Sequence, residues 1–137
     1  MSKFGKCEEP TNNLLISLKE RRSKILFKND AQRKVRKITI DGCYIKNETC
    51  CDYLLINEEQ TEHYVELKGS DLSRALEQIQ ATVQRVSECP KTKSKKAFIV
   101  TTRQPKITAK IANLRVSLRR DFRIDLFAGN SPMEAEI

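Results

Sequence analysis

The sequence predicts a single α/β domain in which a mixed central β-sheet is flanked by helices, in the order αβββαβαβ. A chain of 137 residues is long enough to bury one core without disulfide or metal staples. Short apolar segments typical of strands alternate with segments whose apolar residues recur every three or four positions. Three strands come in succession and each later strand follows a helix, so hairpins followed by right-handed crossovers would build one sheet.

The first half of the chain is expected to hold one helix and three strands. The helix would begin after Thr11, a residue suited to N-capping, and end near Asn29. Its apolar stripe comprises Leu14, Leu15, Leu18 and Ile25. The strands follow at residues 35–45, 51–57 and 63–68, and Asp41-Gly42 marks a turn or bulge inside the first of them.

The second half has the clearest helical pattern of the chain. Ser70-Asp71 would cap a helix that ends at Cys89-Pro90 and carries an apolar stripe of Leu72, Leu76, Ile79, Val83 and Val86. A strand at residues 97–102, a helix opened by Pro105 and a strand at residues 123–128 complete the pattern. Residues 1–128 are therefore expected to form the domain, and residues 129–137 a disordered tail.

Lysine and arginine outnumber the acidic residues by 26 to 18, which gives a net charge of +8 and a pI near 9.4. Such an excess favours a polyanionic partner, either a nucleic acid or an anionic membrane surface. We expect a nucleic acid, contacted by a basic loop and by the last helix. The residues concerned are Lys91, Lys93, Lys95, Lys96, Arg115 and Arg119, although a solvated helix face explains the two arginines equally well.

Several classes of protein are disfavoured by what the sequence lacks. No apolar run approaches the length of a membrane span, and the first residues have no apolar signal core, so we expect a cytoplasmic protein with no membrane partner. The five cysteines form no CxxC pair and are expected to be reduced, mostly buried thiols. His63 has no nucleophile in an evident relation to it, and four glycines leave no phosphate-binding loop.

The most informative stretch is the strand pattern Val65-Glu66-Leu67-Lys68. Alternation places Glu66 and Lys68 on one face of the strand and the two apolar residues on the other. Charged groups seldom lie in such a place unless they are paired or hold a metal. If Asp52 lies on the neighbouring strand, two carboxylates and a lysine converge; otherwise Glu66 and Lys68 form an ordinary solvated pair.

Asp52, thirteen intervening residues and the Glu66-Leu67-Lys68 triplet, followed by a helix, resemble the PD-(D/E)xK nuclease superfamily. The resemblance implies the restriction-endonuclease-like fold and a divalent-metal-dependent endonuclease that hydrolyses DNA. Mg²⁺ or Mn²⁺ would be held by Asp52, Glu66 and the Leu67 carbonyl, and Lys68 would orient or deprotonate the attacking water. Cys51 stands where the family name has a proline, which many members lack.

The resemblance also implies supporting residues and an assembly. Glu20, placed on the expected first helix, is the best candidate for an additional acid, although a solvated pair with Lys24 explains it as well. Gln78 is the nearest analogue of a polar residue on the helix after the lysine. Members of this size act as homodimers or as subunits of larger nuclease complexes. The alternative function is a catalytically inactive, nuclease-like module that binds nucleic acid or protein.

Overall fold

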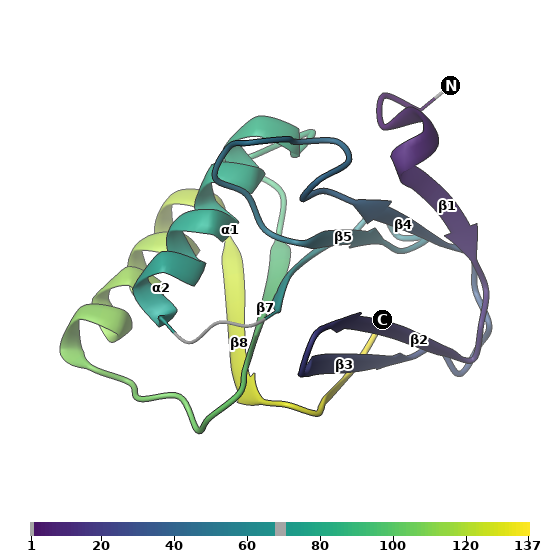
Figure 1. The fold of residues 1–137 in the computed structure, drawn as a ribbon. Helices are drawn as coiled ribbons and strands as arrows, with labels where there is room; N and C mark the ends of the chain where they lie inside the picture. Colours follow the sequence, from purple (N-terminus) through teal and green to yellow (C-terminus); the bar gives the residue numbers. More distant parts are fainter. Residues whose placement is uncertain (1, 68–70) are drawn as a thin grey trace.

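The computed structural model of the protein describes residues 2–67 and 71–137 and has two β-sheets and two α-helices (Figure 1). The larger sheet has six strands in the order β1-β4-β5-β6-β7-β8, and the smaller has the order β2-β3-β9. The elements are β1 (Glu8–Thr11), β2 (Leu15–Glu20), β3 (Ser23–Lys28), β4 (Val35–Thr39), β5 (Tyr53–Ile56), β6 (Glu62–Leu67), α1 (Leu72–Val86), β7 (Lys95–Thr101), α2 (Ala109–Phe122), β8 (Ile124–Asn130) and β9 (Met133–Glu136).

The six-stranded sheet is mixed, which confirms the predicted α/β class. Strands β1, β4, β5 and β6 pair antiparallel, whereas β6, β7 and β8 pair parallel through the crossover helices α1 and α2. Both helices lie on one side of this sheet and the β2–β3 hairpin lies on the other (Figure 1). Strand β6 therefore separates two cores, with Tyr64 packed in the one under the helices and with Val65 and Leu67 packed in the other.

The predicted first helix is wrong, and with it the order αβββαβαβ, because residues 15–28 form the β2–β3 hairpin. Its buried residues alternate with the period of a strand: Ile16 and Leu18 on β2, and Ile25 and Phe27 on β3. Leu14 and Leu15, read as part of a helical stripe, are about half exposed. Three leucines and one isoleucine at helical spacing predicted a helix across what is a two-residue hairpin turn at Arg21 and Arg22.

Residues 129–137 also differ from the disordered tail expected of them. Strand β8 continues to Asn130, and β9 adds to the smaller sheet by pairing parallel with β3. Ser131 fixes the connection, since its N–H donates to the Thr101 carbonyl at 2.8 Å and its hydroxyl donates to the Arg22 carbonyl at 3.1 Å. The tail therefore holds the hairpin against the end of β7.

The other predicted elements are present with shifted bounds. Strand β4 ends at Thr39, because residues 41–45 form the turn that Asp41-Gly42 indicated. Helix α1 begins after Asp71, whose side chain accepts a hydrogen bond from the Arg74 N–H. Helix α2 begins at Ala109 rather than at Pro105, because the Thr108 hydroxyl caps the Ile111 N–H.

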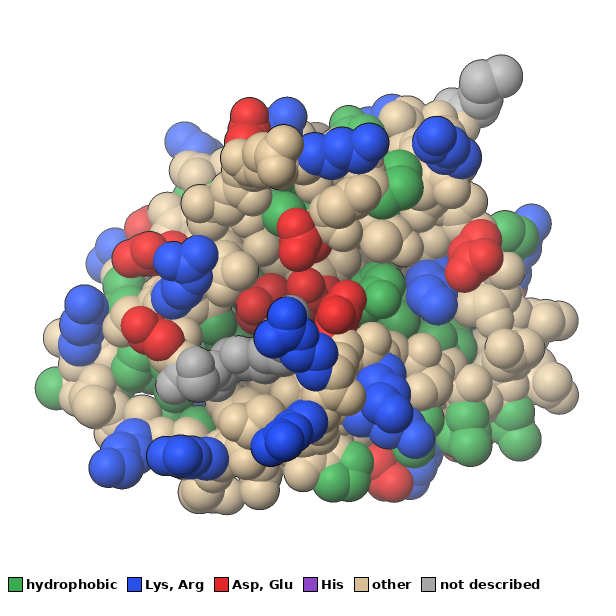
Figure 2. Space-filling model, viewed as in Figure 1, with side chains coloured by type: hydrophobic (Ala, Val, Ile, Leu, Met, Phe, Trp, Pro, Cys, Tyr) green, Lys and Arg blue, Asp and Glu red, His purple; other side chains and the backbone are tan. Residues whose placement is uncertain are grey.

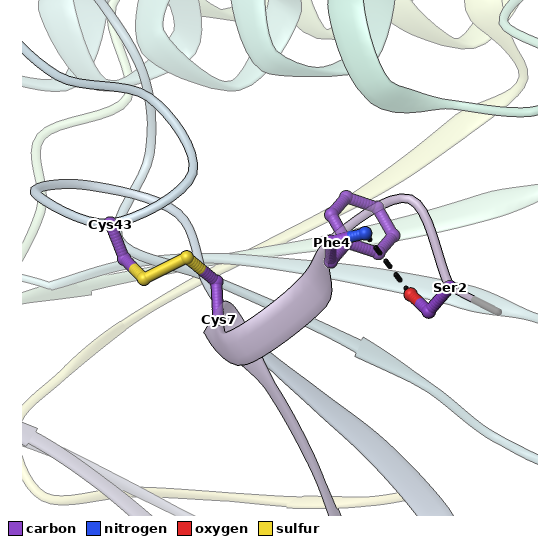
Figure 3. The surroundings of a disulfide bond; sticks show 4 residues. All are labelled: Ser2, Phe4, Cys7 and Cys43. Atoms are coloured by element: carbon purple, nitrogen blue, oxygen red, sulfur yellow. Dashed lines mark hydrogen bonds between the residues drawn. A yellow bond between two sulfur atoms is a disulfide. The ribbon is translucent and has the colours of Figure 1, made fainter.

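Cys7 and Cys43 form a disulfide, which corrects the expectation that all five cysteines are reduced (Figure 3). The bond joins the 3-10 turn Gly5–Cys7 to the loop after β4, with a Cα–Cα distance of 5.8 Å. Phe4 reinforces the link by packing edge-on against Tyr44 at 4.8 Å between ring centroids. Cys50, Cys51 and Cys89 are free thiols, the first two buried.

The Cys43→Ser variant is expected to unfold with a free energy lower by about 2–4 kcal/mol, because the lost bond closes a long loop in the unfolded chain. The two cysteines are 36 residues apart in sequence. Urea denaturation of the oxidised proteins measures the difference, and Cys89→Ser, at an exposed free thiol, is the control. Equal midpoints for the oxidised and reduced wild-type protein would contradict the bond.

His63 is expected to make stability fall in mild acid. Its side chain is 1% exposed, lies between Phe27 and Phe98, and has a pKa lowered to about 4, mainly by burial and then by Lys96. The unfolded chain binds a proton near pH 6.5 and the folded one does not, so stability is lost as the pH falls from about 6.5 to 4.

Over that pH range the loss amounts to about 3 kcal/mol. Urea titrations from pH 7.5 to 4 would measure it, and the His63→Leu variant should show a flatter profile than the wild type. A wild-type profile as flat as that of the variant would show that folding does not lower the pKa of His63.

Candidate active site

Asp52 and Glu66 lie close together where β5 and β6 meet, since the charges of both act on the Cys50 thiol. The register pairs Tyr53 with Val65, and the Asp52 N–H donates to the same Val65 carbonyl, so Asp52 lies beside the last residues of β6. Asp52 and Glu66 are each only 6% exposed. The structure thus places two buried carboxylates near each other at the carboxyl end of β6.

The Asp52 carboxylate also takes the place of a backbone acceptor. The Asp52 N–H donates to the Val65 carbonyl at 3.0 Å, and the Asp52 Oδ2 accepts from the Leu67 N–H at 2.8 Å. The Asp52 carbonyl is occupied by the Ile40 and Asp41 N–H groups. The side chain therefore extends the β5–β6 ladder by one bond, which fixes its orientation toward the end of β6.

Neighbouring groups show that further acids lie close by. Burial raises the pKa of Cys50 to about 12, and the charges of Asp41, Asp52 and Glu66 add to that rise. The pKa of Tyr53 is raised by burial and then by the charges of Glu20 and Asp52. Figure 2 shows acidic side chains gathered at the centre of one face of the molecule, beside the closed end of the β2–β3 hairpin.

Glu20 comes to this region on a strand rather than on the expected helix. It is the last residue of β2, paired with Ser23 across the hairpin turn. Asp41 was not singled out as a site residue in the sequence. Its Oδ1 accepts a contact from the Cys50 thiol at 3.7 Å, and its N–H donates to the Asp52 carbonyl at 3.3 Å. In the sequence, Asp41-Gly42 indicates only a turn or bulge inside the strand expected at residues 35–45, so no pattern there points to a site residue.

Helix α1 positions the segment that carries Asp52. The Gln78 side-chain amide donates to the Cys50 carbonyl at 3.2 Å. The Thr82 hydroxyl accepts from the Cys51 N–H at 2.8 Å and donates to the Gln78 carbonyl at 2.7 Å. Gln78 and Thr82 lie one turn apart on the helix. Because both bond to the backbone just before Asp52, Gln78 fixes the position of the Asp52 carboxylate indirectly. Thr82 shares this role and was missed in the sequence.

The donor set suits a hard divalent cation. Mg²⁺ is commonly held by one or two carboxylates and retains several waters, and Asp52 and Glu66 supply two buried ones. The Leu67 carbonyl lies at the end of the same strand. Among residues 2–67 and 71–137, no three His, Cys, Asp or Glu side chains are grouped so as to hold a metal ion. Lys68, the expected catalytic lysine, lies outside the described residues.

The basic loop expected to contact nucleic acid lies at the other end of the sheet. Lys95 pairs with Glu62 across β6 and β7, and Glu66 is four residues further on, about 13 Å away. The expectation that Lys95 contacts nucleic acid does not fit its position. Lys95 is 1% exposed, and its ammonium donates to the Pro90, Lys93 and Phe122 carbonyls. It holds the loop in place and is not accessible to a phosphate.

The two arginines of α2 that were expected to contact nucleic acid already have partners within the domain. Arg115 donates to the Leu126 carbonyl and Arg119 forms an ion pair with Asp125. Lys91, Lys93 and Lys96 share that far end of the sheet, where β7 begins.

Within the part of the chain that the structure describes, neither helix is long and apolar enough to cross a membrane.

Replacing Thr82 with valine is expected to lower the free energy of unfolding by about 1–3 kcal/mol, because the buried Cys51 N–H then has no acceptor. Thermal or urea unfolding would measure the change. Thr92→Val, the same substitution at an exposed loop position, is the matched control and should stay within about 0.5 kcal/mol. Equal effects of the two substitutions would contradict the role of Thr82.

Comparisons of the chain with protein-family models, with curated proteins and with solved structures give no match.

Proposed function

We propose that the protein is a divalent-metal-dependent endonuclease that hydrolyses the phosphodiester bonds of DNA. One observation carries the proposal: Asp52 and Glu66 lie close together, both buried, at the carboxyl end of β6. Two like charges in such a place repel each other and lose hydration, an arrangement that a bound cation compensates. The excess of basic residues supports an anionic substrate.

The strand order supports a restriction-endonuclease-like core within this larger fold. Strands β4, β5 and β6 run antiparallel, and α1 then leads to the parallel strand β7. The resemblance expected from the sequence has the same antiparallel strands and crossover helix. The β2–β3 hairpin and β9 replace the expected first helix, and Glu20, at the end of β2, lies near enough to Tyr53 for its charge to raise the pKa of that residue.

In this proposal the residues of the chain divide into ligands and positioning groups. Asp52, Glu66 and the Leu67 carbonyl would hold Mg²⁺ or Mn²⁺, which when bound polarises the phosphate and lowers the pKa of a water. The bond from the Leu67 N–H fixes the Asp52 carboxylate, and Gln78 and Thr82 fix the backbone beside it. Lys68 would neutralise charge on the phosphate and orient the attacking water.

The Glu66→Gln variant tests the proposal. It is expected to lose at least about 100-fold in magnesium-dependent cleavage of plasmid DNA, since a metal ligand is removed. Magnesium at ten times its dissociation constant should stabilise the wild type by about 1.4 kcal/mol and the variant by much less.

The Glu77→Gln variant is the matched control, since Glu77 is an exposed residue on α1. It should cleave and respond to magnesium as the wild type does. Lys68→Ala should lose cleavage but keep the magnesium response. Strong DNA binding without cleavage and without a magnesium response in the wild type would refute the nuclease and favour the inactive binding module.

A further inference from the structure

We propose that the DNA backbone is bound by a basic surface that runs from the β2–β3 turn to the cavity beside the helix starts. This hairpin–cavity surface is defined by Arg21, Arg22, Arg103 and Lys106. It lies at the same end of the sheet as Asp52 and Glu66. The inference deepens the proposed function and rests on it, because it assigns the substrate contacts of the same site.

The two halves of the surface are joined by three hydrogen bonds. The Ser131 hydroxyl donates to the Arg22 carbonyl, and the Ser131 N–H donates to the Thr101 carbonyl. The Thr101 hydroxyl in turn donates to the Arg103 carbonyl. The hairpin turn and the loop after β7 are therefore held as one wall around the carboxyl end of β7.

The cavity supplies room for a substrate. It has a volume of about 680 Å³ and is lined by Asp71, Ser73, Thr102, Arg103, Lys106 and Thr108, among others. Such a volume is typical of sites that take a small molecule or one unit of a polymer. Asp71 and Leu72 line it at the start of α1, and Thr101 lines it at the end of β7, the strand that pairs with β6.

The charges of this surface are available to a partner. Arg21, Arg22, Arg103 and Lys106 form no ion pair with any acidic residue among those that the structure describes. The arginines of α2 differ, since Arg119 and Arg120 are paired with Asp125 and Asp121. Lysine and arginine side chains lie beside the central acidic group, over the closed end of the hairpin (Figure 2).

Arg21 also occupies a strained position. Its φ of 48° lies in the left-handed region, where a two-residue hairpin turn favours glycine or asparagine. An exposed arginine contributes no packing that would offset this strain. A role in binding accounts for a charged residue at that position.

The experiment compares two double variants that remove the same charge from opposite ends of the sheet. Arg22→Gln/Arg103→Gln changes the proposed surface, and Lys91→Gln/Lys93→Gln changes the far loop. Binding to a short fluorescein-labelled DNA duplex is followed by fluorescence anisotropy in EDTA, so that no cleavage occurs. The first variant should bind at least about 10-fold more weakly at 0.1 M salt, with a salt dependence smaller by about two ions.

The far-loop variant should bind within about twofold of the wild type. Arg21→Gly should also bind more weakly while unfolding at a higher urea concentration, which separates binding from stability. Equal losses in the two double variants, or a loss in the far-loop variant alone, would overturn the inference. The inference would also be overturned if Arg22→Gln/Arg103→Gln lost binding to phosphatidylserine vesicles but bound DNA as the wild type does.

These experiments distinguish a failure of the proposed DNA-binding surface from a failure of the proposed nuclease activity. A wild type that binds through Arg22 and Arg103 but does not cleave with magnesium or manganese would refute the nuclease and retain the surface. If the wild type cleaves DNA and Arg22→Gln/Arg103→Gln binds DNA as tightly as the wild type, the nuclease is retained and the surface is refuted.

Discussion

Strand β6 is buried along its whole length, and the polar interior of the protein follows from that constraint. Strands on both sides and cores on both faces cover it, yet it carries Glu62, His63 and Glu66. A buried polar group is costly unless it is hydrogen-bonded, and a buried charge costs still more unless it is paired. Glu62 accepts hydrogen bonds from the hydroxyls of Tyr64 and Ser87, and His63 remains neutral through its lowered pKa. Each of these two groups is thus accommodated by the chain itself.

The two ends of β6 differ in chemistry because their buried carboxylates have different surroundings. Glu62 lies opposite Lys95, whose ammonium holds three carbonyls of the adjoining segments, so that end is a closed structural network. Glu66 lies near Asp52, and the nearby charges of Asp41 and Glu20 are also negative. Several acidic groups close together repel one another and so do not stabilise a fold, whereas such clusters are common at functional sites.

The sequence predicted the part of the fold that depends on short-range patterns. The stripe of α1, the alternation of β5 and β6, and the pairing that brings Asp52 to Glu66 could all be anticipated from period and turn chemistry. The β2–β3 hairpin could not, because Leu14 and Leu15 imitate a helical stripe and its turn has arginines instead of Asn-Gly. The basic loop precedes β7 and lies at the amino end of that strand, and its contact with nucleic acid stays a prediction.

The third strand of the smaller sheet has a consequence for the order of folding. The contact between Ser131 and Arg22 joins residues 109 positions apart, and β9 pairs with β3 over a similar separation. Closing so long a loop is slow compared with forming a helix or a hairpin. During synthesis the hairpin therefore waits for residues 131–136 before its wall beside the carboxylates is complete. A growing chain would therefore form the β2–β3 hairpin well before the wall that joins it to the end of β7.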